Sequence, residues 1–135
     1  MRRPFRVVVS GRSMLPTLSP GDRLLAVRVT RFRRGDVWVF RHRGVLLVKR
    51  IAALPGDRVF LGEGMKAVVT AIRAPVAERP GPQPDGSWLL GPDEYLMRGD
   101  NRRESTDLRA FGPLGADSLV GRVVVRYWPR PARVR

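Results

Sequence analysis

Apolar and polar positions alternate along this chain in short runs that are rich in β-branched residues and bounded by glycine or proline. This pattern is typical of β-strands, and helical periodicity is scarce. The runs that we predict to be strands are residues 5–10, 23–29, 37–41, 45–51, 58–61 and 120–127, with weaker candidates at 66–73 and 87–90. We therefore expect a mostly β fold, a small and largely antiparallel arrangement of short strands that is closed or partly closed.

Turn signals separate the predicted strands. Gly-Asp dipeptides at 21–22, 35–36, 56–57 and 99–100 predict turns, and short helical turns are expected at 14–18 and around Asp117. Residues 74–86 contain four prolines and are predicted to form an exposed loop. With 135 residues, the chain is expected to form one domain over 1–135 that includes this loop.

The composition excludes several kinds of site. The chain has no cysteine, which rules out disulfides, thiolate metal sites and cysteine nucleophiles. His42 is the one histidine, and its position between two arginines and before a glycine predicts an exposed turn. A zinc site with several histidines is therefore impossible, and we expect no metal and no cofactor. Proton abstraction would have to use lysine, a carboxylate or tyrosine.

The formal net charge is +14, and 24 of the 26 basic residues are arginines. Composition bias explains part of this excess, and attraction to anionic lipids or nucleic acid is the functional alternative. The arginines are scattered without an aromatic-interleaved stripe, so no specific nucleic-acid partner is expected. The longest apolar stretch, 45–48, is too short to cross a bilayer or to form an export signal. We therefore expect a soluble chain.

Lysine occurs at only two positions, Lys49 and Lys66, in a chain that otherwise uses arginine. Strand alternation places Lys49 on an apolar face with Leu47 and Ile51. A lysine can lose its proton in such surroundings, whereas arginine cannot. To act as a base near neutral pH, its pKa must fall by about three units from roughly 10.4, or about 4 kcal/mol, which burial can supply. The alternative is a lysine that snorkels from a strand edge.

Two other segments offer chemistry. Ser13 follows an apolar strand and Gly11 and precedes a turn limited by proline, which can hold a hydroxyl at the rim of a sheet with the backbone N–H of Ser13 facing an oxyanion. A serine in such a turn can equally be a structural hydrogen-bonding residue. In the polar segment 99–109, Ser105 could hydrogen-bond the Lys49 amine, while Asp107 and Arg109 could brace the loop. An ordinary solvated turn is the alternative there.

The ordered set of these motifs resembles the signal peptidase I family of serine proteases, and the resemblance covers most of the chain. The matching motifs are Ser13-Met14-Leu15-Pro16-Thr17-Leu18 with Gly21-Asp22, Gly35-Asp36-Val37 with Val39-Phe40, Lys49-Arg50 with Leu54-Pro55-Gly56-Asp57, and Gly99-Asp100-Asn101-Arg102 with Ser105, Asp107 and Arg109. Each motif is moderately specific alone, and their order along the chain makes the set highly specific.

The resemblance implies an endopeptidase with a Ser–Lys dyad, which cleaves signal or leader peptides from precursor proteins after small residues. Lys49 would be the general base and Ser13 the nucleophile. Ser105 would orient Lys49, and Asp100, Asp107 and Arg109 would support the site. The precursor would bind as an extended strand between 7–10 and 46–48. A small pocket would be lined by Val9, Met14, Leu18 and Val48.

The sequence departs from the family pattern at several places. Many members carry a serine two residues before the nucleophile to complete the oxyanion hole, where this chain has Gly11. The usual Val-Gly after the basic pair is replaced by Ala52-Ala53, and the second β subdomain has shrunk to, at most, 58–90. The amino-terminal membrane anchor of the family is missing from this sequence.

These departures leave several functions open. A minimal signal peptidase would associate peripherally with a membrane, without its own transmembrane segment, and an anionic membrane surface is then a second candidate partner. A soluble relative of the nickel superoxide dismutase maturation proteases would trim a precursor in the cytoplasm. A LexA-like self-cleaving regulator would need a DNA-binding domain, for which the nine residues before Ser10 leave no room. An inactive basic binding module is the non-enzymatic alternative.

Overall fold

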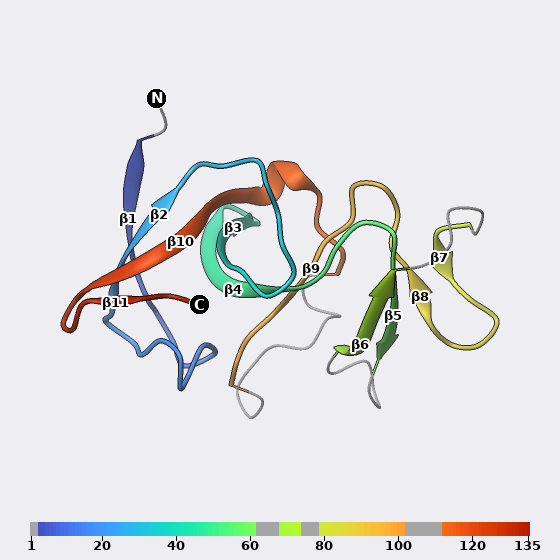
Figure 1. The fold of residues 1–135 in the computed structure, drawn as a ribbon, viewed down its shortest axis with the longest axis horizontal. Helices are drawn as coiled ribbons and strands as arrows, with labels where there is room; N and C mark the ends of the chain where they lie inside the picture. Colours follow the sequence, from blue (N-terminus) through green and yellow to red (C-terminus); the bar gives the residue numbers. More distant parts are fainter. Residues whose placement is uncertain (1–2, 62–67, 74–78, 102–111) are drawn as a thin grey trace.

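The computed structural model describes residues 3–61, 68–73, 79–101 and 112–135, which form two antiparallel sheets (Figure 1). The larger sheet contains, in spatial order, β1 (Pro4–Val8), β2 (Arg23–Val27), β10 (Leu119–Trp128), β3 (Val37–His42), β4 (Val45–Ala53) and β9 (Leu96–Arg98), with β11 (Ala132–Arg133) paired to β10. The smaller sheet contains β6 (Val68–Arg73), β5 (Asp57–Leu61), β8 (Trp88–Leu89) and β7 (Gly81–Pro82) in that order. The mostly β, antiparallel fold expected from the sequence is confirmed.

The larger sheet remains open, because its end strands β1 and β9 do not pair with each other in the described part of the chain. All eight predicted strands are present, with ends that differ from the predictions by a few residues. Strands β7, β9 and β11 were not predicted, because two or three residues are too few for alternation to be visible.

The short elements agree with the turn chemistry. A 3₁₀ helix, η2 (Ala116–Ser118), lies where a helical turn is expected, and in the turn at 14–18 the Leu18 N–H donates to the Met14 carbonyl at 2.9 Å. Within the stretch predicted as a proline-rich loop, Gly81–Pro82 forms strand β7 against β8. Pro82 is tolerated there because β7 is an edge strand with one partner.

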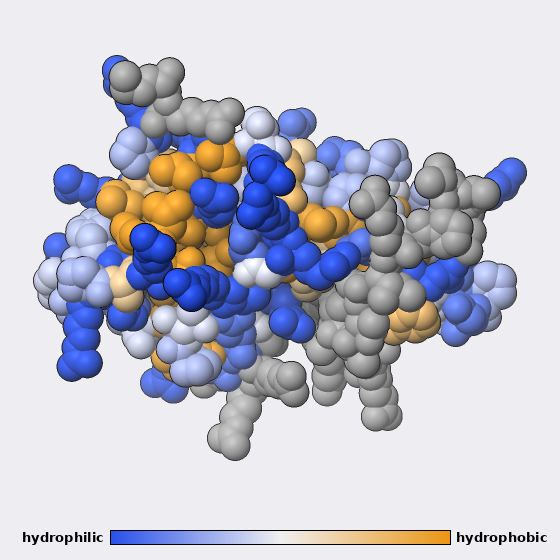
Figure 2. All heavy atoms as spheres, viewed as in Figure 1, coloured by the Kyte–Doolittle hydropathy of each residue, from blue (hydrophilic) through white to orange (hydrophobic). Residues whose placement is uncertain are grey.

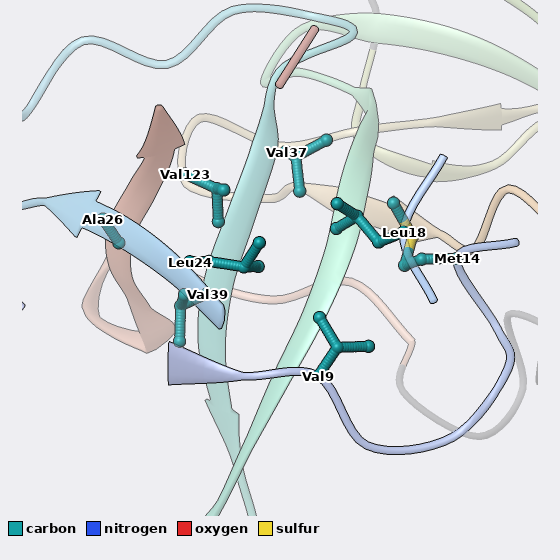
Figure 3. Packing of buried hydrophobic residues seen from close by; sticks show 8 residues of the cluster. All are labelled: Val9, Met14, Leu18, Leu24, Ala26, Val37, Val39 and Val123. Carbon is teal, nitrogen blue, oxygen red and sulfur yellow. The ribbon is translucent and has the colours of Figure 1, made fainter. Parts of the chain in front are cut away.

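The core is divided into three clusters. Strands β2, β3 and β10 contribute Leu24, Ala26, Val37, Val39 and Val123 to the first, where the segment after β1 adds Val9, Met14 and Leu18 (Figure 3). On the other face of β3, a second cluster surrounds Trp38 and Phe40. A third joins the two sheets through Ala53, Val59 and Leu96. Strand β4 therefore lies between separate apolar layers, and this position decides the surroundings of each of its side chains.

Figure 2 shows apolar side chains gathered on the half of the molecule formed by the larger sheet, with hydrophilic side chains around them. Among the residues whose burial the structure describes, the large apolar residues that remain exposed are Val8, Val45, Leu46 and Trp128. Among the residues that the structure describes, no helix has the length and apolarity needed to span a membrane.

Candidate functional site

A groove of about 190 Å³ lies between the end of β1 and the first half of β4. Its walls are Val7, Val8, Val9, Ser10, Ser13, Met14, Val45, Leu46, Leu47, Val48 and Lys49. Ser13 and Lys49 are separated by 35 residues in the sequence, and the fold brings them to the same groove. It is lined mainly by apolar side chains, with two serines and one lysine as its polar side chains.

Both walls of the groove have unpaired backbone edges. Strand β1 pairs only with β2, and Val9 extends that pairing through bonds with Asp22 and Gly21. Strand β4 pairs with β3 from Val45 to Arg50, whereas on its other side β9 reaches only Arg50, Ile51 and Ala53. Within the described ranges, the groove side of Val45–Lys49 therefore has no partner strand, and this edge can accept an extended peptide.

The turn that carries Ser13 is held from both sides. The Asn101 backbone N–H donates to the Ser13 carbonyl at 2.8 Å, and the Asn101 side-chain amide donates to the Arg12 carbonyl at 2.9 Å. Below the turn, Met14 is buried in the first core cluster with 1% of its surface exposed. The Ser13 N–H makes no hydrogen bond to any part of the chain that the structure describes. It is therefore available to an oxyanion.

Lys49 is buried, with 5% of its surface exposed. Its cross-strand neighbour on β3 is Trp38, which belongs with Ile51 to the second core cluster. The burial expected from strand alternation is thus confirmed. Desolvation lowers the pKa of the Lys49 ammonium from its ordinary value of 10.5, because the charged form loses its hydration. A lysine in this position is biased towards the neutral amine that a general base needs.

The next residue on β4, Arg50, points to the other side and joins three segments. Its Nε and Nη2 donate to the two carboxylate oxygens of Asp100 at 2.8 and 2.6 Å, and its Nη1 donates to the Gly35 carbonyl at 2.6 Å. Thr17 adds a hydroxyl donor to Asp100 at 2.6 Å. Bidentate contact of this kind is short and charge-assisted. It fixes Asp100 and, one residue later, the Asn101 that holds Ser13.

The charges of this ion pair reinforce each other. The hydrogen bonds that Arg50 donates to Asp100 raise the pKa of Arg50 further above its usual value. Burial alone would raise the pKa of Asp100, but hydrogen bonds from Arg50 and Thr17 outweigh it and lower that pKa below its ordinary 3.8. Both groups therefore stay charged at neutral pH. The supporting position predicted for Asp100 has a physical basis in these contacts.

Only some of the remaining predicted site residues line the groove. Val9, Met14 and Val48 line the groove, whereas Leu18 packs with Val9 and Met14 in the core and is not among the lining residues. Gly11 is exposed with a φ of +81°, and an added Cβ would meet no atom within 4 Å. The predicted roles of Ser105, Asp107 and Arg109 concern residues outside the described ranges.

The segments 7–10 and 46–48, between which the precursor strand is predicted to bind, both line the groove. Sequence reasoning missed two features of the site, the first of which is that Val45 lines the groove as well. The two hydrogen bonds of Asn101 were not predicted, although its place directly after Asp100 was a usable signal. Within the described part of the chain, no group of three or more histidine and carboxylate side chains could hold a metal ion.

Comparisons with known proteins agree with this arrangement. Residues 4–128 match the family described as signal peptidase, peptidase S26. A probable signal peptidase I-2 of Synechocystis is 36% identical over 143 residues, which cover 91% of this chain and 62% of the relative. A probable thylakoidal processing peptidase 2 of Arabidopsis thaliana is 33% identical, covering 93% of this chain and 38% of the relative. Signal peptidase IB of Staphylococcus aureus is 30% identical, covering 90% and 76%.

The chain thus spans 62% of the length of the Synechocystis relative and 38% of the plant relative. The match nevertheless includes both walls of the groove, the Ser13 turn and the Arg50–Asp100 pair, since all of these lie between residues 4 and 128. The chain belongs to the signal peptidase family, peptidase S26.

Proposed function

We propose that this protein is a serine endopeptidase that removes signal or leader peptides from precursor proteins with a Ser13–Lys49 dyad. The observation that carries the proposal is the location of a buried lysine and a half-buried serine in one groove with unpaired strand edges. Membership of the signal peptidase family supports the same reaction class. The Ser105 hydroxyl is proposed to orient the Lys49 amine, with Asp107 and Arg109 as further support.

In the proposed reaction, the neutral Lys49 amine takes the proton of the Ser13 hydroxyl as its oxygen attacks the scissile carbonyl. The Ser13 N–H donates to the developing oxyanion, and Gly11 lets the chain turn without a side chain beside that oxygen. The leaving amine takes the proton from Lys49, which leaves an acyl-enzyme on Ser13. Lys49 then activates the water that hydrolyses this ester.

The groove also supports a preference for small residues at the cleavage site. A precursor strand laid between β1 and β4 would present alternate side chains to Val9, Met14 and Val48, with Leu18 closing the core behind Met14. A volume of about 190 Å³ shared along the groove leaves little space for each side chain. Bulky residues are therefore excluded by sterics rather than by lost polar contacts. Peripheral contact with an anionic membrane, favoured by the net charge of +14, belongs to the same proposal.

The deciding experiment compares wild type, Ser13→Ala and Ser19→Ala on a secretory preprotein and a leader-bearing cytosolic precursor, with products identified by mass spectrometry. Ser19 is exposed, and its turn uses its backbone: its N–H donates to the Asp22 carboxylate and its carbonyl accepts from the Asp22 N–H. We expect Ser13→Ala to abolish cleavage and Ser19→Ala to cleave as wild type does. Equal processing by wild type and Ser13→Ala would refute the enzyme. The precursor that is cut identifies the substrate class.

A further inference from the structure

A second hollow of about 630 Å³ lies away from the groove. It is bounded by the turn before β3, by the middle of β10 and by the carboxyl-terminal segment, which runs back along β10 (Figure 1). The Val134 N–H donates to the Val124 carbonyl at 3.1 Å and ties that segment to β10. The hollow falls within the range of volumes that small-molecule sites occupy. We call it the arginine cleft.

The arginine cleft has a concentrated positive charge. Five of its eleven lining residues are arginines, namely Arg33, Arg34, Arg122, Arg133 and Arg135. Across the chain as a whole, 24 of 135 residues are arginine, so the cleft is enriched more than twofold. Only Arg34 has a carboxylate partner among the residues described, namely Asp57 at 2.8 Å. Guanidinium groups that converge on a concave surface favour a bidentate oxyanion ligand, above all phosphate.

The one acid that lines the cleft is Asp36. Its Oδ2 is buried and has no hydrogen-bond partner among the described residues. The charge of nearby Arg50 attracts this carboxylate, but the oxygen itself lacks a donor among these residues. Because Asp36 lines the cleft, a ligand with an N–H or O–H beside its negative charge can donate to its carboxylate, whereas a fully deprotonated anion is repelled by it.

We propose that the arginine cleft binds a phosphate group that carries a hydrogen-bond donor, with the arginines holding the anionic oxygens and Asp36 accepting from the donor. Hydrogen phosphate has such a P–O–H group, and a phosphate ester whose alcohol carries free hydroxyls brings an O–H donor beside its anionic oxygens. Sulfate has the same shape but no proton at neutral pH, so Asp36 weakens its binding. This site is independent of the proposed peptidase, since none of its lining residues lines the groove.

The first test titrates inorganic phosphate and sulfate, at equal ionic strength and pH 7, into wild type and Asp36→Asn by calorimetry. We expect wild type to bind phosphate at least about tenfold more tightly than sulfate. Asp36→Asn should lose this preference because an amide can donate to sulfate. Equal affinities of wild type for the two anions would overturn the role of Asp36, and no saturable binding of phosphate would overturn the site.

The second test separates a built site from the general charge of the protein. Arg122→Gln and Arg133→Gln each remove one cleft arginine, and Arg130→Gln removes one exposed arginine that does not line the cleft. We expect each cleft variant to weaken phosphate binding about tenfold and Arg130→Gln to weaken it less than twofold. If all three variants weakened phosphate binding equally, the phosphate would be an adventitious ion only, attracted by the general charge of the protein. That result would refute the proposal. Arg133 is exposed, so its variant remains informative if Arg122→Gln fails to fold.

A third comparison identifies the source of the phosphate. Vesicles of phosphatidylcholine with phosphatidylglycerol, whose headgroup hydroxyls are donors, are compared with phosphatidylcholine vesicles and with free glycerol phosphate. Binding to the phosphatidylglycerol vesicles that Arg122→Gln loses indicates a lipid headgroup, and binding to glycerol phosphate alone indicates a soluble ester. Failure of both ligands to depend on Arg122 would overturn the proposal. Ser13→Ala should bind the phosphate ligands as wild type does, so a failure of the proposed peptidase activity can be distinguished from a failure of the cleft.

Discussion

The groove and the arginine cleft are two hollows of the same chain, and their electrostatic environments are opposite. Apolar side chains dominate the groove, and its one cation, Lys49, is 5% exposed. In the cleft, five arginines gather around one carboxylate, and four of them are classed as exposed. Burial lowers the pKa of a lysine and so favours its neutral form, whereas arginine keeps its charge in either environment. The difference teaches that residue type and depth together decide whether a basic side chain serves as a base or as an anion ligand.

Strand β4 and the residue Arg50 connect the two regions. Lys49 faces the groove, while Arg50 donates to the carbonyl of Gly35, which lines the cleft, and to Asp100 beside the Ser13 turn. Neighbouring residues of one strand thus support different hollows, as the alternation of side chains requires. The comparison can be tested by exchanging, removing or titrating these groups.

The largest effect is expected from Lys49→Arg, which would give the groove the residue that suits the cleft. Arginine keeps a positive charge but cannot be deprotonated, so it cannot accept the Ser13 proton. We expect cleavage of a precursor to fall at least about 1,000-fold, as for removal of a catalytic dyad member. Arg41→Lys, the opposite exchange at an exposed position, should leave the rate unchanged. Substantial activity in Lys49→Arg would show that Lys49 is not the base.

A smaller but still large effect is expected when the Arg50–Asp100 connection is broken. The two side chains are only 15% and 13% exposed, so Asp100→Leu leaves Arg50 nearly buried, with the Gly35 carbonyl and the charge of Asp36 as its remaining compensation. We expect the free energy of unfolding to fall by about 3 kcal/mol, measured by urea denaturation. The control is Asp85→Asn, because Asp85 is 54% exposed and its 3.6 Å contact with Arg58 is screened by water. An asparagine there also keeps an oxygen that can accept the hydrogen bonds from Ser87. A similar loss in both variants would contradict this account.

A double variant sharpens the same test. Asp100→Leu combined with Arg50→Met removes both charges, and we expect it to recover much of the lost stability because no unpaired ion remains. A double variant as unstable as Asp100→Leu alone would mean that the bonds to Thr17 and Gly35 account for the stability of this region.

Much of the fold could be predicted from the sequence, because strands such as 37–41 and 45–51 are short runs of β-branched and other apolar residues that follow a glycine turn. The alternation of side chains along a strand located Lys49 on an apolar face. What failed depends on contacts between distant segments. The place of Asn101 after Asp100 does not by itself reveal that Asn101 holds the Ser13 carbonyl, and nothing local indicates that Arg33 and Arg133 share a cleft. Strand β9 was missed because its three residues gain their ladder bonds from β4 rather than from their own propensity.

A smaller effect is expected in the pH dependence of the acylation rate and of stability, both of which depend on Lys49 in the groove. Because burial lowers the pKa of Lys49, the acylation rate should rise about tenfold per pH unit below that pKa and level off above it. The sign for stability follows from proton binding: between the lowered folded pKa and the ordinary unfolded value, the unfolded chain binds more protons. Stability should therefore rise with pH in this window. Lys49→Met should lack that rise in denaturation curves, while Arg130→Gln keeps it.

The smallest effect is expected when glycine is replaced by alanine in two turns, one next to the groove and one at the arginine cleft. Gly11 and Gly35 have φ values of +81° and +94°, and an added Cβ would have no neighbour within 4 Å at either. Alanine at these positions would therefore meet backbone strain without a steric clash, and each variant should lose about 1 kcal/mol of unfolding free energy. Ser10→Ala, at an exposed residue next to Gly11, is the control and should change stability little. The two variants could also differ, with Gly11→Ala leaving the unfolding free energy unchanged and Gly35→Ala lowering it. In that case the Ser13 turn would be able to relax while the turn at the arginine cleft would not, and the cleft would be the more rigid of the two hollows.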